Sequence, residues 1–128
     1  MTPAAEAKRT VVIVGASDKP HRASLELLQR LLADARYQTV LVHPRLREIE
    51  GRPVLPSLAE VPPRPELVTL YVNAGISASM EADLKRLRPK KVIFNPGAEN
   101  PALMESLKRD GIGTEEACSL VQLSQNGL

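Results

Sequence analysis

The residues best suited to chemistry are the small and cationic side chains that follow the first apolar run of the chain. This run, 11–14, stops at Gly15-Ala16-Ser17, and Lys19, His21 and Arg22 follow before an apolar-periodic helix. A buried strand that passes through a small-residue turn into a helix N-terminus presents backbone N–H groups and the positive end of the helix dipole to an anion. The stretch predicts a site for a phosphorylated nucleotide.

The glycine pattern of this turn differs from the dinucleotide fingerprint G-x-G-x-x-G. Gly15 holds the first glycine position, but Ser17 and Pro20 stand at the other two. Without the second glycine, a pyrophosphate can approach the backbone less closely, although the Ser17 hydroxyl can donate a hydrogen bond instead. A Gly-Ala-Ser turn alone is equally typical of a plain strand-to-helix connection, and the basic cluster of Lys19, His21 and Arg22 is what favours phosphate. The alternative for these cations is a solvated basic loop.

A second apolar run, 39–42, ends at His43-Pro44, and Arg45 and Arg47 follow it. A site for NAD has Asp or Glu at this point to bind the ribose 2′-hydroxyl, and none is present. Positive charge suits a phosphorylated ribose instead. The pattern excludes plain NAD and leaves NADP, with its 2′-phosphate, and coenzyme A, with its 3′-phosphate. The alternative for the two arginines is a solvated surface loop.

The elements that must position these residues alternate between strands and helices. Because each strand is a continuous apolar run, the pattern predicts an α/β fold: a doubly wound, mostly parallel, five-stranded Rossmann-like sheet with helices on both faces. We expect a long crossover over 43–66, which holds six prolines, with a helical turn near 57–60. The expected strands are 10–14, 39–42, 67–72, 91–94 and a short one near Ile112; the expected helices are 24–35, 79–87, one opening at Asn100-Pro101 and ending before Gly111, and 116–123.

Composition narrows the classes of function. The net charge is +2 and the aromatic residues are two tyrosines and one phenylalanine, which argues against a nucleic-acid binder that stacks bases. The basic stretch 86–91 is typical of a solvated helix end. No apolar run reaches membrane-spanning length, and the N-terminus has no signal-peptide core. We expect a flexible arm over 1–8, a single domain over 9–128, a cytoplasmic location and possible homodimers.

Several blocks, taken together, resemble the small single-domain CoA-binding proteins, whose fold is the CoA-binding Rossmann domain also found in succinyl-CoA synthetase. GASDKPHRAS is similar to the family's G-A-S-x-x-P-x-R-x-S turn. VHPRLREIEGRPVLPSLAEVP resembles its V-N-P-x-x-x-E-I-x-G-x-x-x-x-x-S-L segment. The later blocks LVTLYVNA, KVIFNPGAENPAL and GI-x-x-x-EAC-x-L-V-x-L resemble the branch that ends in E-A-C. The similarity covers about residues 9–125.

The resemblance implies that coenzyme A lies along the carboxyl edge of the sheet, with each part of the ligand beside one loop. The expected pyrophosphate contacts are Gly15, Ala16, Ser17, Arg22 and Ser24. His43-Pro44, which stands where the family usually has Asn-Pro, would lie near the adenosine. Lys19, Arg45 and Arg47 are plausible phosphate partners by charge and position, and Asn73 and Asn95-Pro96-Gly97 would face the pantetheine arm or the adenine edge.

No set of side chains in the sequence demands catalysis. His21 and His43 lack partners at the spacing of a metal site, so we expect no bound metal. Cys118 is the reactive candidate: it is either a small buried hydrophobe or a thiol at a helix N-terminus that approaches the CoA thiol and forms a mixed disulfide with it under oxidation. We expect a non-catalytic module that binds CoA or acyl-CoA as carrier, sensor or regulator. The alternatives are an NADP-binding reductase or redox sensor and a scaffold subunit.

Overall fold

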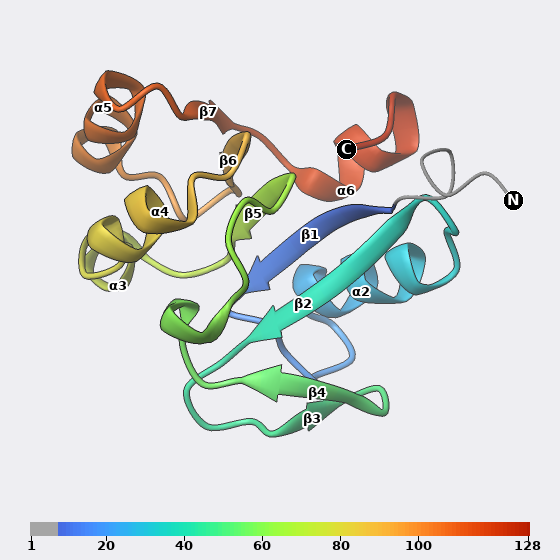
Figure 1. Ribbon diagram of the computed structural model, residues 1–128. Coiled ribbons are helices and arrows are strands. Elements are labelled where there is room, and N and C mark those ends of the chain that lie inside the picture. Colours follow the sequence, from blue (N-terminus) through green and yellow to red (C-terminus); the bar gives the residue numbers. More distant parts are fainter. Residues whose placement is uncertain (1–7) are drawn as a thin grey trace, which may run out of the picture.

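The computed structural model describes residues 8–128, and a mixed sheet forms its centre (Figure 1). Within these residues the sheet has seven strands in the order β3-β4-β2-β1-β5-β6-β7. All neighbours pair in parallel except β3 and β4, which pair antiparallel. The strands are β1 (Arg9–Val14), β2 (Tyr37–Val42), β3 (Glu48–Ile49), β4 (Arg52–Leu55), β5 (Leu67–Leu70), β6 (Lys91–Phe94) and β7 (Gly113–Glu116).

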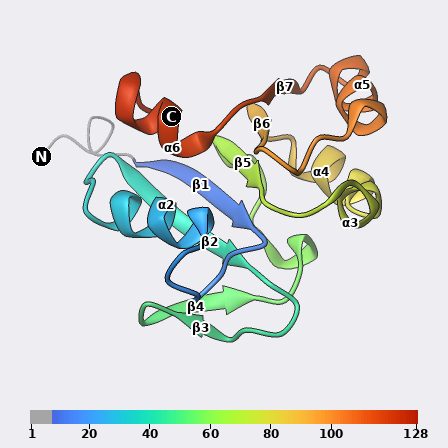
Figure 2. The ribbon, with the colours of Figure 1, turned by 180° about the vertical axis from the view of Figure 1, so that it is seen from behind.

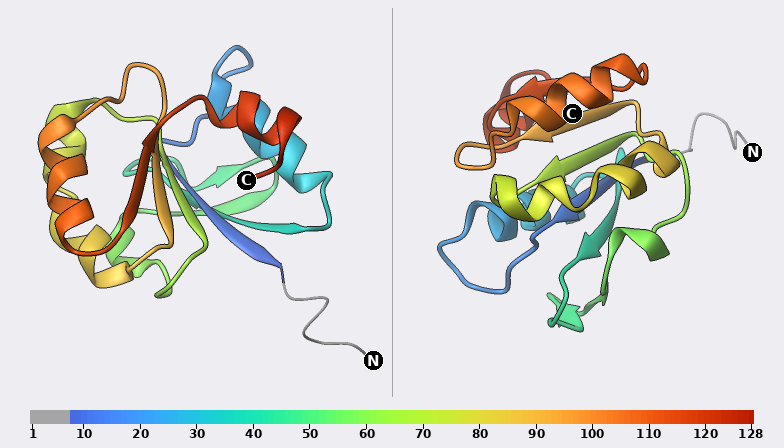
Figure 3. Two further views of the ribbon diagram at one scale, coloured as in Figure 1. Left: turned by 90° about the horizontal axis from the view of Figure 1, so that it is seen from above. Right: turned by 90° about the vertical axis from the view of Figure 1, so that its left-hand side faces the viewer.

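Helices cover both faces of the sheet, as the view from above in Figure 3 shows. One layer contains α3, α4 and α5, together with the short 3₁₀ helix η1, and the opposite layer contains α2 and α6. Figure 2 shows α2 lying across β1 and β2 from behind. The bounds are α2 (Ala23–Leu32), η1 (Leu58–Glu60), α3 (Ala74–Ala78), α4 (Glu81–Leu87), α5 (Pro101–Arg109) and α6 (Ser119–Gln125).

Strand β1 explains why the sheet is buried on both sides. Val12 and Val14 pack into the core beneath α4 and α5, whereas Val11 and Ile13 pack into the core beneath α2. Successive side chains of a strand point to opposite faces, so an unbroken apolar run supplies both cores. The sequence pattern therefore predicted a mostly parallel α/β sheet correctly.

The number of strands was predicted wrongly. The proline-rich segment 43–66 is not a plain crossover: it forms β3 and β4 before the expected helical turn at η1. Glu50 and Gly51 join the two strands with φ of 52° and 74°. Two consecutive positive φ values are typical of the tight turns that connect antiparallel strands. The prolines concealed this hairpin, although Pro53 is accommodated opposite Glu48.

Several element boundaries also differ from those expected. The helix expected over 79–87 is observed as α4, from Glu81 to Leu87, and an additional short helix, α3, precedes it. The Asn73 Oδ1 starts α3 by accepting the Ile76 N–H at 2.9 Å. The last helix begins at Ser119 rather than 116, since Glu116 pairs in β7 with Phe94. The expected arm at 1–8 lies, except for residue 8, outside the described residues. No helix in residues 8–128 combines the length and the apolar character that crossing a membrane requires.

Candidate functional site

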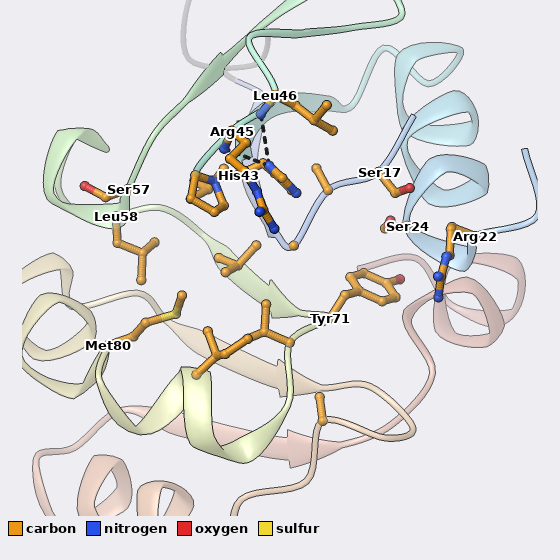
Figure 4. Close-up of a pocket in the computed structure, with 18 of the residues that line it drawn as sticks. Ser17, Arg22, Ser24, His43, Arg45, Leu46, Ser57, Leu58, Tyr71 and Met80 are labelled. Atoms are coloured by element: carbon orange, nitrogen blue, oxygen red, sulfur yellow. Dashed lines mark hydrogen bonds between the residues drawn. The ribbon is translucent and has the colours of Figure 1, made fainter. Parts of the chain in front are cut away.

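A cleft of about 1020 Å³ opens at the carboxyl ends of the parallel strands (Figure 4). Its walls come from the segments that follow β1, β2, β4, β5 and β6, and from α3 and the start of α4. This is the edge at which open α/β sheets bind ligands. The cleft brings together these residues predicted from sequence: Gly15, Ala16, Ser17, Lys19, Arg22, Ser24, His43, Pro44, Arg45, Pro96 and Gly97.

The glycine turn after β1 is shaped by its neighbouring strands. The N–H groups of Gly15 and Ala16 both donate to the Val42 carbonyl, at 3.0 and 3.3 Å. Gly15 has φ of 82°, and a Cβ at this position would lie 2.9 Å from Val72 Cγ1 and 3.2 Å from the Tyr71 carbonyl carbon. These two N–H groups are thus engaged within the protein, and the glycine is required for the fold.

The N-terminus of α2 offers the donors that the turn does not. Arg22 occupies the N-cap position, and its side chain makes no capping hydrogen bond. Within the described part of the chain, no hydrogen bond engages the N–H groups of Ala23 and Ser24 or the Ser24 hydroxyl. Ser24 is only 4% exposed and lines the cleft. Unengaged N–H groups at a helix start, beside a serine hydroxyl that bonds to no residue of the described chain, can bind an anion.

Three cationic side chains line the same cleft: Lys19, Arg22 and Arg45. None of them forms an ion pair with another residue of the described chain. Of the two acidic residues that also line it, Asp83 lies 3.6 Å from Arg86 Nε, at the far end on α4. The other acidic residue, Asp18, adjoins Lys19 and forms no ion pair within the described chain. Three cations and one carboxylate at this end therefore leave an excess of positive charge close to the α2 N-terminus.

His43 fixes the loop that follows β2. Its Nδ1 accepts hydrogen bonds from the N–H groups of Arg45 and Leu46, both at 3.0 Å, as the dashed lines in Figure 4 show. Because Nδ1 accepts hydrogen bonds, it carries no proton itself, and the proton of the neutral imidazole is on Nε2. The same pattern of two N–H donors is what an asparagine Oδ1 accepts in an Asx turn. His43 can thus hold the same turn that an asparagine would hold at this position.

The other half of the cleft is apolar. Leu58 of η1, Val72 after β5, Ile76 of α3 and Met80 before α4 all line it. Ile76 is 46% exposed, one of two large hydrophobic side chains in the described chain with such exposure. Sequence reasoning missed these four residues because it followed polar side chains. The helical spacing of 76 and 80 was the available signal.

Tyr71 lines the cleft between the two halves, and its ring packs against the core beneath α2. Its hydroxyl is buried and forms no hydrogen bond of acceptable geometry within residues 8–128. Burial raises the pKa of Tyr71 to about 12, against a smaller lowering by the nearby hydroxyls of Thr69 and Ser119. The phenol therefore stays protonated and contributes its ring rather than its charge to the cleft wall.

Four residues predicted for the site do not line the cleft. The Asn73 side chain caps α3, and the Arg47 carbonyl accepts the Val54 N–H at 3.0 Å in the hairpin. Asn95 is 1% exposed, and both the nitrogen and the oxygen of its side-chain amide form internal hydrogen bonds. Cys118 is partly buried at the N-cap of α6. The Asn95 amide is directed by Thr69 and Ser119, which are distant in sequence and which local sequence does not reveal, whereas Asn73 is held by a local cap on Ile76.

Comparison with known proteins places these features in a family. The model of a "CoA binding domain" family matches residues 9–124. A solved structure titled as an uncharacterized protein has 31% identity and a TM-score of 0.85, covering 95% of this chain and 99% of that one. A hypothetical protein from Pyrococcus horikoshii OT3 has 24% identity and a TM-score of 0.84, covering 92% and 83%.

A larger protein shares the fold. The dinucleotide-forming acetyl-coenzyme A synthetase 1 of Ca. Korarchaeum cryptofilum, in complex with phosphate and ADP, has 18% identity and a TM-score of 0.69. The match covers 89% of this chain and 26% of that one, so the domain described here corresponds to one part of that protein. The family match confirms the resemblance stated from the sequence: the chain belongs to the CoA-binding domain family.

Proposed function

We propose that this protein binds coenzyme A or an acyl-CoA in the cleft at the carboxyl edge of its sheet, and acts as a non-catalytic carrier, sensor or regulatory module. One observation carries the proposal: a single cleft joins unpaired cations and a helix N-terminus to an apolar wall. Coenzyme A combines phosphates with a flat base and a largely uncharged arm. The two halves of the cleft match these two kinds of surface.

The pyrophosphate fits the N-terminus of α2. The N–H groups of Ala23 and Ser24, the Ser24 hydroxyl and the Arg22 guanidinium are the donors on this side of the cleft. A doubly charged group gains from charge-assisted hydrogen bonds and from the helix dipole. The phosphate is thereby moved from the glycine turn, where the N–H groups of Gly15 and Ala16 are engaged, to the start of the helix.

The adenosine fits between the β2 loop and the apolar wall. His43 and Pro44 form one side, and Leu58, Val72 and Met80 form the other. Such surfaces suit the faces of a planar base. The pantetheine arm would then leave across Pro96 and Gly97, where a Cβ built on Gly97 meets nothing within 4 Å.

The absence of a catalytic role is part of the proposal and rests on how the reactive groups are used. His43 Nδ1 is engaged by two backbone donors and is not free to act as a base. Cys118 does not line the cleft, and its mixed disulfide with CoA stays a sequence-based prediction. A fold of this kind does not by itself imply catalysis, so the role has to be argued from the groups that line the site.

The experiment is a calorimetric titration of the reduced protein with CoA and, at the same salt concentration, with NADP. We expect saturable one-site binding of CoA and much weaker binding of NADP. The Arg22→Gln variant should lose about tenfold in CoA affinity, the value of a charge-assisted contact. Arg109→Gln, which removes the same charge from the last turn of α5, is the matched control and should bind CoA normally.

Two results would reject the proposal. Tight binding of NADP with no response to CoA would favour a reductase or redox sensor. An equal loss of CoA affinity in Arg22→Gln and Arg109→Gln would show that only the overall charge matters, and that the cleft is not the site.

A further inference from the structure

The loop after β2 is held at both ends. The His43 N–H donates to the Leu55 carbonyl at 3.0 Å, and the Arg47 carbonyl accepts the Val54 N–H at 3.0 Å. Between these points, the His43 imidazole accepts the N–H groups of Arg45 and Leu46. Pro44 has no N–H and a fixed φ, so it adds no competing donor. The backbone of Arg45 therefore has one defined position at the edge of the cleft.

Arg45 is the cation that this loop presents. It lines the cleft, its side chain is exposed, and no carboxylate of the described chain pairs with it. Arg47, two residues further, does not line the cleft. The loop thus directs one of its two arginines toward a ligand. An arginine that starts from a fixed backbone loses less conformational freedom when it binds a phosphate.

We infer that His43 is a positioning residue that sets the selectivity of the cleft for the 3′-phosphate of CoA, by holding Arg45 in place through its Nδ1. The Nε2–H, on the other side of the same ring, remains available as a donor to the nucleotide. This inference rests on the proposed function, since it identifies the residues that recognise one phosphate of the proposed ligand. It adds that the histidine acts through the arginine and not through its own charge.

The test compares CoA with 3′-dephospho-CoA, which lacks only the phosphate in question. For the unmodified protein we expect CoA to bind about tenfold more tightly, as a charge-assisted contact predicts. Arg45→Ala should abolish this preference, and Arg47→Ala, the matched control, should keep it. His43→Ala should lower the preference as far as Arg45→Ala does. The double variant His43→Ala/Arg45→Ala should be no worse than Arg45→Ala, because the two residues act as one unit.

His43→Asn separates positioning from a merely structural role. Its Oδ1 can accept the same two N–H groups, so we expect it to restore the preference for CoA that His43→Ala loses. In the ligand-free protein, a long-range ¹H–¹⁵N spectrum should show the proton of His43 on Nε2, which requires no variant. Thermal unfolding of each variant checks that it is folded.

The outcomes distinguish a failure of the proposed function from a failure of the inference about His43 and Arg45. If the unmodified protein binds neither CoA nor dephospho-CoA, the proposed function fails. If it binds both equally well, the function stands and the inference about His43 and Arg45 is wrong. The inference is also wrong if His43→Ala keeps the preference, if His43→Asn fails to restore it, or if the imidazole proton is found on Nδ1.

Discussion

Asn95 and Ser119 are joined by a hydrogen bond of 2.9 Å, in which the Asn95 Oδ1 accepts the backbone N–H of Ser119. Ser119 is the first residue of α6, and the residue at the N-cap, Cys118, makes no capping bond with its own side chain. Asn95 therefore caps α6 from the end of β6. Its Nδ2 donates to Thr69 Oγ1 at 2.6 Å and to the Leu70 carbonyl at 2.9 Å, so a single buried amide ties β5, β6 and α6 together.

We expect Asn95→Ala to lower the free energy of unfolding by about 2 to 4 kcal/mol, because it leaves several buried polar groups without partners. Urea unfolding monitored by circular dichroism measures this. Asn73→Ala is the matched control: it removes an exposed asparagine that caps the five-residue α3, and should cost about 1 kcal/mol. Equal losses in the two variants would contradict the structural role assigned to Asn95.

The case of Asn95 shows which parts of the site the sequence could predict. The position of Asn95-Pro96-Gly97 at the carboxyl edge followed from the apolar run before it, and Pro96 and Gly97 do line the cleft. The direction of the Asn95 side chain depends on Thr69 and Ser119, which are 26 and 24 residues away. Local periodicity carries no information about such partners.

The cations of the cleft could be predicted from the sequence, whereas the hairpin could not. Lys19, Arg22 and Arg45 were identified because each follows an apolar strand within a few residues, which fixes their position by topology alone. The strands β3 and β4 have two and four residues, too short for a period to appear, and contain or adjoin prolines. Only the pair Glu50-Gly51 signalled the turn between them.

Gly15 is expected to be a stability residue. Gly15→Ala combines a positive φ with a contact against the Tyr71 backbone, and should cost about 2 to 4 kcal/mol in urea unfolding. Gly111→Ala is the control, since Gly111 has nearly the same φ, 81°, but its nearest atom is Arg88 Nη2 at 3.8 Å. In Gly111→Ala the free energy of unfolding should fall only by the cost of a positive φ in alanine, about 1 to 2 kcal/mol. Indistinguishable losses would show that the packing of Val72 and Tyr71 around Gly15 is unimportant.

The raised pKa of Tyr71 predicts that the free energy of unfolding decreases at alkaline pH. Its pKa is raised from 10.0 to about 12, so folding favours the protonated phenol. The resulting stability is present below pH 10 and is lost as the pH rises from 10 to about 12. Across this window the free energy of unfolding should fall by about 2 to 3 kcal/mol more in the unmodified protein than in Tyr71→Phe.

The measurement for Tyr71 is urea unfolding of both proteins across this window, together with phenolate absorbance. Below pH 10, Tyr71→Phe should be no less stable than the unmodified protein, because the lost hydroxyl has no hydrogen-bond partner among the described residues. Parallel stability curves for the two proteins would show that the Tyr71 hydroxyl is accessible to water.

Ser24 allows the phosphate site to be tested without disturbing the fold. Ser24 is only 4% exposed at the start of α2, but no residue of the described chain bonds to its hydroxyl, so Ser24→Ala should change the free energy of unfolding by less than about 0.5 kcal/mol. The same substitution removes a donor from the proposed pyrophosphate site. We expect the affinity for CoA to fall about three- to tenfold, the value of one ordinary hydrogen bond of about 1 kcal/mol.

Calorimetric titration with CoA measures the effect of Ser24→Ala. Ser124→Ala is the matched control, because it removes an exposed hydroxyl from α6 that bonds to Arg30 and to the Leu120 carbonyl. It should bind CoA as the unmodified protein does. If Ser24→Ala also kept its full affinity while remaining folded, the pyrophosphate would not lie at the α2 N-terminus. The unpaired Lys19 and Arg45 would then be the groups to which its binding should be traced.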